Sequence, residues 1–194
     1  MKKSASDTRQ HILDVAKSII AHKGYTAVGL AELVTAAGVP KGSFYYYFKS
    51  KEEFGQILLK EYFNEYLSRA KTILSSPEGT AHDRLLNYFR VSSEIQTTGK
   101  PEDKCLTVKL GAEVCDLSEG MRSILCQGTV DIIDQLTQCI ESGQSDNSIS
   151  ADISPRVLAE SLYQLWLGAS LIAKVAKDTD PFDSAIEMTQ RLLS

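Results

Sequence analysis

The sequence has no long apolar run. Its longest uncharged apolar stretches, such as the one from Leu162 to Ala173, fall short of the roughly 18 to 20 residues that a membrane-spanning helix needs. The N-terminus carries basic residues, but no apolar segment follows them, so a secretory signal is not indicated. We therefore expect a cytoplasmic protein that does not associate with a membrane.

Cysteine and histidine are scarce. No two of the four cysteines have the C-x-x-C spacing of zinc or dithiol sites, so they should be free thiols in a reducing compartment. The three histidines are far apart, and no nucleophile elbow, phosphate loop or H-E-x-x-H is present. The sequence thus indicates no metal, no cofactor and no enzyme. The residues are Cys105, Cys115, Cys126, Cys139, His11, His22 and His82.

Charge is divided unevenly along the 194 residues. Residues 1–60 hold nine Lys or Arg against five Asp or Glu, a net charge of +4, whereas residues 61–194 hold twelve against twenty, a net charge of −8. A basic segment on an acidic body can place one face against phosphate. The 43% hydrophobic and 24% charged content is that of a globular protein, which excludes disorder.

Apolar residues recur with a helical period in almost every segment, and no strand pattern or internal repeat stands out. Gly24, Gly38 and the segment 75–79 mark breaks, while Pro40, Pro155 and Pro181 fit first helical turns. The sequence therefore predicts an all-α fold of about nine helices. Their expected bounds are 7–22, 30–37, 40–48, 50–74, 81–97, 103–116, 118–142, 155–177 and 181–193.

The second and third of these helices are joined by a turn over 37–40 of the length that a helix-turn-helix uses. Phe44 and Phe48 should anchor the third helix in the core. Its outward side should carry Ser43, Tyr46 and Tyr47, with Lys41 and Gly42 at its start and Lys49 and Lys51 past its end. Helix N-terminal amides, lysines and tyrosine hydroxyls all bind phosphate oxygens, so this is a candidate DNA-recognition helix.

The five aromatic rings of this segment have a second interpretation, in which they simply fill a small core. We expect this for Phe44 and Phe48, but a compact three-helix unit cannot hide all five rings. Exposed Tyr46 and Tyr47 beside lysines favour DNA binding.

About the first 55 residues resemble the signature of the TetR family of transcriptional regulators. The matching positions are Gly24-Tyr25, Leu33, Ala36-Ala37-Gly38-Val39 and the run from Lys41 to Glu52. Where relatives often carry Ser or Thr, this chain has Val28 and Gly29, and it has Pro40 in place of a frequent Ser; Thr26 is an alternative phosphate contact. The resemblance implies operator contacts by Lys41, Gly42, Ser43, Tyr45, Tyr46, Tyr47 and Lys51.

The resemblance further implies a three-helix DNA-binding domain over 1–51, a helical sensor and dimerisation domain over 52–194, and a homodimer formed by the last two helices. A stripe of apolar and small residues at helical spacing agrees with such an interface. The same stripe fits an ordinary intramolecular core helix, and its pattern does not distinguish the two. The stripe is Leu158, Leu162, Leu165, Trp166, Gly168, Ala169 and Ala173.

The segment from Cys105 to Ser118 resembles a subset of that family, the NemR-like repressors of electrophile-detoxifying enzymes, and 165–169 resembles the C-terminal helix of the same group. The resemblance implies that Cys105 senses oxidants or electrophiles and that Lys174 is its partner. A helix start between Lys104 and Lys109 should also favour the thiolate form of Cys105. The other three cysteines are expected to be small buried hydrophobes.

Together these observations predict a repressor that binds double-stranded operator DNA and releases it when a small electrophile or oxidant modifies Cys105. One alternative is a TetR-like repressor whose inducer is another small molecule bound noncovalently in the helical pocket. A third possibility, from a different class, is a helical adaptor that binds only protein partners; the basic N-terminal segment argues against it.

Overall fold

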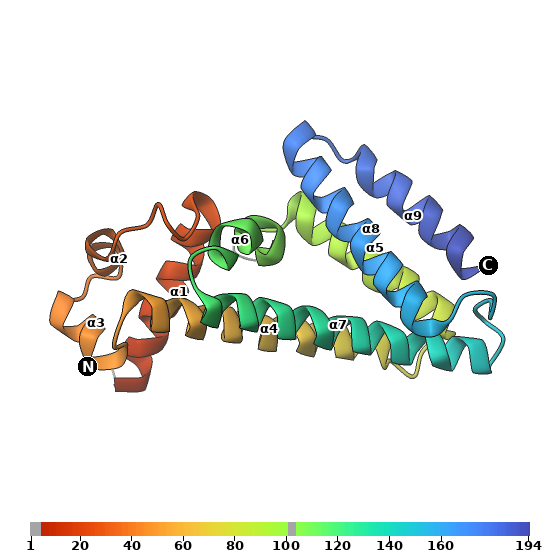
Figure 1. Cartoon of the computed structure of the whole chain (residues 1–194), viewed down its shortest axis with the longest axis horizontal. Helices are drawn as coiled ribbons and strands as arrows, with labels where there is room; N and C mark the ends of the chain where they lie inside the picture. Colours follow the sequence, from red (N-terminus) through yellow and green to blue (C-terminus); the bar gives the residue numbers. More distant parts are fainter. Residues whose placement is uncertain (1–4, 101–103) are drawn as a thin grey trace. The chain divides into compact units, whose positions relative to one another are not determined.

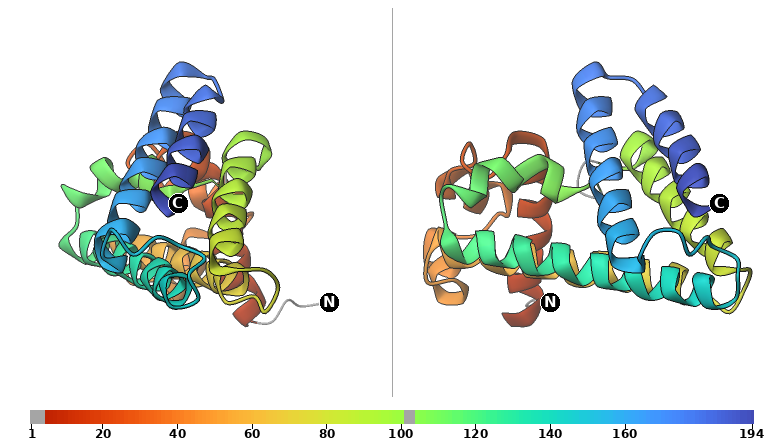
Figure 2. Two further views of the ribbon diagram at one scale, coloured as in Figure 1. Left: turned by 90° about the vertical axis from the view of Figure 1, so that its right-hand side faces the viewer. Right: turned by 45° about the vertical axis from the view of Figure 1, so that its right-hand side comes forward.

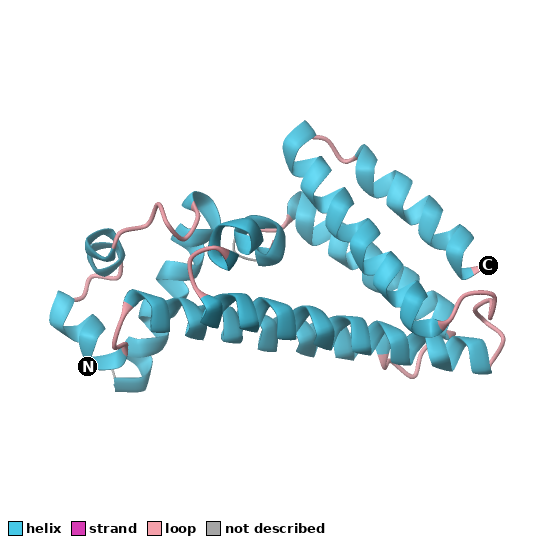
Figure 3. Cartoon of the chain, viewed as in Figure 1, coloured by secondary structure: helices cyan, strands magenta, loops and turns pink. Residues whose placement is uncertain are grey.

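The computed structural model describes residues 5–100 and 104–194, and within these ranges it contains nine α-helices and no strand (Figure 3). The bounds lie within a few residues of those predicted from periodicity, so the all-α expectation is confirmed. None of the described helices is long and apolar enough to cross a membrane. The helices are α1 (Ala5–Lys23), α2 (Leu30–Ala36), α3 (Lys41–Tyr47), α4 (Lys51–Leu74), α5 (Ala81–Thr98), α6 (Leu106–Cys115), α7 (Glu119–Ser145), α8 (Pro155–Ala176) and α9 (Asp180–Leu193).

The chain forms two compact units. The first, here called the head unit, comprises residues 1–63 and 100–125, and the second, the body unit, comprises residues 64–99 and 126–194. Helices α4 and α7 therefore each contribute to both units (Figure 1). The compact units do not follow the predicted boundary after residue 51, because α6 and the start of α7 pack with the N-terminal helices. That boundary stays a prediction about function.

The head unit is built around aromatic side chains from α3 and α4. Phe44, Phe48 and Phe54 are fully buried, with ring centroids 5.0 to 5.4 Å apart. Gly38, in the turn between α2 and α3, has a φ of +64°, a value that favours glycine. This core confirms the anchoring role predicted for Phe44 and Phe48 and fixes α3 on the unit.

Helix α6 belongs to the head unit as well. Its Leu106, Leu110 and Val114 are buried, and the backbone N–H of Leu106 donates a hydrogen bond of 3.2 Å to the hydroxyl of Tyr62 in α4. The hydroxyl of Ser118, just before α7, donates to Glu52 at 2.6 Å. The segment expected to carry the sensor cysteine is thus packed on α4, in the same compact unit as α1, α2 and α3.

In the body unit, α5, α8 and α9 pack together around a second core, and α8 and α9 lie side by side in every view (Figure 2). The indole of Trp166 stacks on Phe89 at 4.8 Å and on Phe182 at 6.1 Å between ring centroids. Its Nε1–H donates to the hydroxyl of Thr189 at 2.9 Å, and that hydroxyl donates to the carbonyl of Ala185. The polar groups of this buried cluster are therefore paired.

Candidate functional site

The recognition helix predicted from sequence, α3, projects several side chains into solvent. Tyr46 is 78% exposed and Tyr45 is 50% exposed, and Lys41 and Gly42 are exposed at the helix start. A Cβ atom added to Gly42 would meet no neighbouring atom within 4 Å, so the start of α3 is open to a close approach. An open helix start with exposed lysine and tyrosine suits phosphate and base contacts in a DNA groove.

Tyr47 departs from the prediction, because it is half-buried. Its ring packs edge-on against Tyr46, with centroids 4.9 Å apart, and also lies 6.4 Å from the ring of Phe48. Tyr47 is three residues after the buried Phe44, which turns it partly toward the core face of the helix. The more exposed neighbours are Tyr45 and Tyr46, which were both among the predicted contacts. Ser43 is half-buried.

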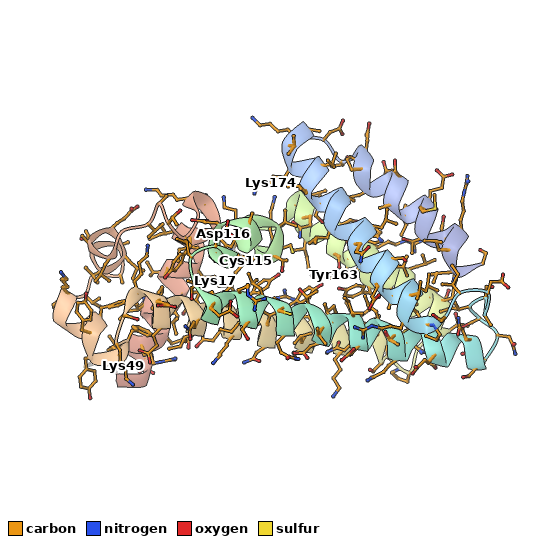
Figure 4. The ribbon with its side chains drawn as sticks, viewed as in Figure 1. Lys17, Lys49, Cys115, Asp116, Tyr163 and Lys174 are labelled. Carbon is orange, nitrogen blue, oxygen red and sulfur yellow. The ribbon has the colours of Figure 1, made fainter. Side chains whose placement is uncertain are left out.

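Lys51 has a partner within the head unit. Its ammonium donates to the backbone carbonyl of Tyr25 at 2.9 Å and lies 4.5 Å from the centroid of the Tyr25 ring. Burial lowers the pKa of Lys51, although the nearby Glu113 acts in the opposite direction. By contrast, Lys41 and Lys49 are exposed, and Lys49 lies two residues after the end of α3 at Tyr47 (Figure 4). They are therefore the better candidates for simple phosphate contacts.

Thr26, considered from sequence as an alternative phosphate contact, is engaged elsewhere. Its backbone N–H and its hydroxyl both donate to the carboxylate of Glu113 in α6. No periodicity or motif of the sequence pointed to this contact, which joins positions 87 residues apart. Glu113 is the main residue of this region that the sequence analysis missed.

Cys105 is the N-cap residue of α6, so the helix-start position predicted for it is confirmed. It is half-buried and its thiol makes no capping hydrogen bond. Of the two lysines expected beside it, Lys109 donates from its ammonium to the carbonyl of His22 at 2.9 Å. The cationic group of Lys109 is thus committed to the end of α1.

The remaining cysteines differ more than the sequence suggested. Cys139 is buried as expected, its Sγ is 3.7 Å from the carbonyl oxygen of Ala81, and burial raises the pKa of its thiol. Cys115, the last residue of α6, is half-buried (Figure 4), and Cys126 is exposed on α7. The expectation of burial is therefore wrong for Cys126, because its position on α7 turns it to solvent.

The stripe predicted to form the dimer interface largely faces the core of the same chain. Leu158, Leu162, Trp166, Ala169 and Ala173 are buried in the body unit, and Leu165 packs against them. Only Gly168 of the predicted set is exposed, with open space where a Cβ would lie. A spacing of three and four residues defines one face of a helix but not what covers that face, which is why the two interpretations could not be separated.

A different face of α8 is uncharged, rich in apolar side chains and open to solvent. Its exposed residues recur every three to four positions and none is charged, although Arg156 and Lys174 on the same helix are exposed beside them. Val175 is 72% exposed, Ile172 54%, Val157 53% and Leu171 47%. We call this set the outer face of α8: Val157, Ser161, Gln164, Gly168, Leu171, Ile172 and Val175.

Lys174, the partner that the resemblance implied for Cys105, lies in the last turn of α8 in the body unit (Figure 4), whereas Cys105 lies in the head unit. Among the residues that the structure describes, no group of three or more His, Cys, Asp or Glu side chains is arranged to hold a metal ion. The candidate functional sites are thus the exposed surface of α3, which could bind DNA, and the start of α6, which carries Cys105.

A short helix presented on an aromatic core by a preceding helix and turn defines a helix-turn-helix DNA-binding protein. Comparison with known families agrees with this class. The family model described as bacterial regulatory proteins, tetR family, matches residues 12–55, and the model described as tetracyclin repressor-like, C-terminal domain, matches residues 81–189. The chain belongs to the tetR family of bacterial regulatory proteins.

Individual relatives are similar over the whole chain. The HTH-type transcriptional repressor NemR of Escherichia coli (strain K12) is 39% identical over 193 residues, covering 100% of this chain and 97% of the relative. The crystal structure of the reduced form of E. coli NemR matches with a TM-score of 0.92, covering 97% of each chain. The HTH-type transcriptional repressor DhaR of Mycobacterium sp. (strain GP1) is 32% identical, covering 90% of this chain and 86% of DhaR. These homologues are transcriptional regulators and not enzymes.

Proposed function

We propose that this protein is a transcriptional repressor that binds double-stranded operator DNA as a homodimer and releases it when a reactive electrophile or oxidant modifies Cys105. The observation that carries the DNA-binding part is the open surface of α3, where Lys41, Gly42, Tyr45 and Tyr46 are exposed together. The full-length similarity to a repressor supports the same conclusion.

The operator should consist of two related half-sites. Each head offers only one short recognition helix of seven residues, so specific affinity has to come from two heads bound at once. Duplexes selected by the protein from a random-sequence library should therefore share a pseudo-palindrome. If the selected duplexes had no common sequence, operator recognition would be contradicted, and a protein-binding adaptor would become the better interpretation.

Lysines around α3 should contribute phosphate contacts. Lys41→Ala and Lys49→Ala should each weaken binding to selected and unrelated duplexes by a similar factor, since phosphates carry no sequence information. Each loss should also reduce the slope of log affinity against log salt by about one. Lys51→Ala is the less specific test, because it also removes the contact with Tyr25. Arg191→Ala, at an exposed position of α9, is the control and should bind normally.

The outer face of α8 is the proposed dimer surface. It lacks charge, exposes four large apolar side chains and carries Gly168, which leaves space for a second helix backbone. Exposed apolar patches of this kind mark association sites, and small residues let helices approach closely. The face is isologous in a two-fold dimer, so each copy would cover the same residues of the other.

Cys105 is the proposed sensor, supported by its helix-cap position and by similarity to NemR. With a maleimide, the thiolate sulfur adds to the C=C bond, and the neighbouring carbon takes up a proton. With a peroxide, the thiolate sulfur takes one oxygen to give sulfenic acid, the O–O bond breaks, and the other oxygen leaves, with a proton, as water or an alcohol.

The covalent proposal is tested with four single cysteine-to-serine variants. Cys105→Ser should bind the operator normally but fail to release it on maleimide treatment, whereas Cys115→Ser, Cys126→Ser and Cys139→Ser should still respond. Cys126 is the informative control because it is exposed. If release occurs while mass spectrometry finds Cys105 unmodified, or persists in Cys105→Ser, a noncovalent inducer in the body unit replaces the covalent sensor.

A further inference from the structure

The turn between α1 and α2 is held by a carboxylate from α6. The backbone N–H of Tyr25 donates to Glu113 Oε2 at 3.1 Å, and the N–H and hydroxyl of Thr26 donate to Oε1 of the same side chain. Gly24 has a φ of +91°, and a Cβ at this position would lie 3.0 Å from Glu113 Oε2. Glycine therefore both permits the turn and leaves room for the carboxylate.

A second α6 side chain binds the end of α1. The ammonium of Lys109 donates to the carbonyl of His22, one of the C-terminal carbonyls of α1 that have no partner within the helix. Lys109 and Glu113 are four residues apart and so lie on the same face of α6. One α6 face thus binds both the carbonyl end of α1 and the amides of the following turn.

The α1–α2 turn is also fixed to the start of α4, the helix that follows the recognition helix α3. The hydroxyl of Tyr25 donates to the carbonyl of Lys51 at 2.7 Å, while the Lys51 ammonium donates to the carbonyl of Tyr25 at 2.9 Å. Lys51 begins α4, four residues after the end of α3 at Tyr47. A shift of the turn would therefore act on the segment that carries α3.

The charge of Glu113 suits this contact. Burial alone would raise the pKa of its carboxyl, but hydrogen bonds from Thr26 and Tyr25, together with nearby Lys51, lower it. The side chain is thus an anion at neutral pH. Hydrogen bonds to an anion are stronger than those between neutral groups. Replacing Glu113 with glutamine, a neutral amide of nearly the same size, should therefore weaken the contact.

We propose that Glu113 and Lys109 are positioning residues that clamp α6 to the α1–α2 turn and hold the recognition helix in its operator-binding arrangement. The proposal deepens the function proposed above and rests on it, since Cys105 occupies the N-cap position of the same helix, one turn before Lys109. An adduct at Cys105 disturbs the start of α6, and the clamp carries that disturbance to the α1–α2 turn.

The test compares Glu113→Gln with Glu119→Gln. Both remove one negative charge from the head unit, but Glu119 is exposed, is paired with Arg122 and makes no contact with the turn. Glu113→Gln should weaken binding to the selected operator duplex on the order of tenfold, a typical coupling between sites, while Glu119→Gln binds as wild type. Dimer mass and circular dichroism at the assay temperature should match wild type in both variants.

Two further measurements separate positioning from simple stabilisation. Thr26→Val should weaken binding too, but its effect should be much smaller in the Glu113→Gln background, because the two residues share one contact. The ratio of operator affinities before and after maleimide treatment should also fall in Glu113→Gln and stay at the wild-type value in Glu119→Gln. A residue that only stabilised the fold would leave this ratio unchanged.

Unchanged operator affinity and an unchanged release ratio in Glu113→Gln would overturn the clamp. That result would leave the covalent sensor intact, provided that wild-type protein still releases DNA on treatment. Failure of wild-type release would instead contradict the sensor, and the effect of Glu113→Gln on untreated operator binding would still decide the clamp.

Discussion

At the scale of single residues, the hydroxyl of Thr189 is a buried group with a defined partner. It accepts from Trp166 Nε1 and is itself fully buried. Thr189→Val keeps the shape but leaves the indole N–H unpaired, so it should lower the free energy of unfolding by roughly 1–3 kcal/mol. Urea unfolding measures this, and Thr189→Ser, which keeps the hydroxyl, should lose less. Equal losses would mean that methyl packing, and not the hydrogen bond, matters at this position.

Glu113 should make stability depend on pH in the acid range. Its pKa is below the ordinary value of 4.5, so its contribution is complete above that pH and is lost as pH falls through the lower, folded-state value. The groups facing it are Lys51, Tyr25 and Thr26, and among these only the lysine is charged in that range. The unfolding free energies of wild type and Glu113→Gln should therefore differ most near neutral pH and converge in acid. A difference independent of pH would contradict this ionic role.

At the scale of secondary-structure elements, the faces of α8 have opposite roles. Val175→Glu and Ile172→Glu place a charge on the outer face, where the monomer is undisturbed but a dimer would bury an unpaired carboxylate. Both variants should sediment as folded monomers. The control is Leu117→Glu, which places the same charge on a 55% exposed apolar residue of the head unit and should sediment as wild type does.

Ala169→Glu serves as the contrasting case for the same helix. Its side chain is 8% exposed in the body core, so it should unfold that unit instead of separating two copies. If the Val175→Glu and Ile172→Glu variants each still formed a stable dimer, the dimer interface could not be the outer face of α8.

The helices were predictable because their signals are local. Apolar spacing, Gly24, Gly38 and the prolines at helix starts act within a few residues, and they placed the ends of α1, α3 and α8 closely. The side of α8 that meets the core was not predictable, because both faces carry apolar residues at helical spacing. A contact such as that between Glu113 and Thr26 produces no pattern in the neighbouring sequence, because it depends on where α6 packs in the folded chain.

The candidate site followed the same division. Lys41, Gly42 and Tyr46 could be placed on an exposed helix from their distance to Phe44 and Phe48 in sequence. The partner of Lys51 could not be, because Tyr25 reaches it only through the folding of the α1–α2 turn. Helical periodicity correctly placed Cys105 near a helix start. Its reactivity, which only the NemR-like resemblance implied, stays a prediction for the serine variants to decide.

At the scale of the whole molecule, two compact units share two helices, and this should couple their unfolding. Residues 51–63 of α4 lie in the head unit and 64–74 in the body unit, and α7 is divided after residue 125. Unfolding either unit would remove packing from a helix that the other unit needs, so we expect one cooperative transition.

The fluorescence of Trp166 can test whether the two units unfold together. It is the single tryptophan of the sequence, stacked between Phe89 and Phe182, so its emission reports on the body unit alone, whereas far-ultraviolet circular dichroism reports on the helices of both units. The two signals should change together as urea is added, which is the standard sign of a two-state transition. If ellipticity fell before the emission changed, the head unit would melt on its own. The same indole then lets a dye-free titration show whether an inducer disturbs the body core.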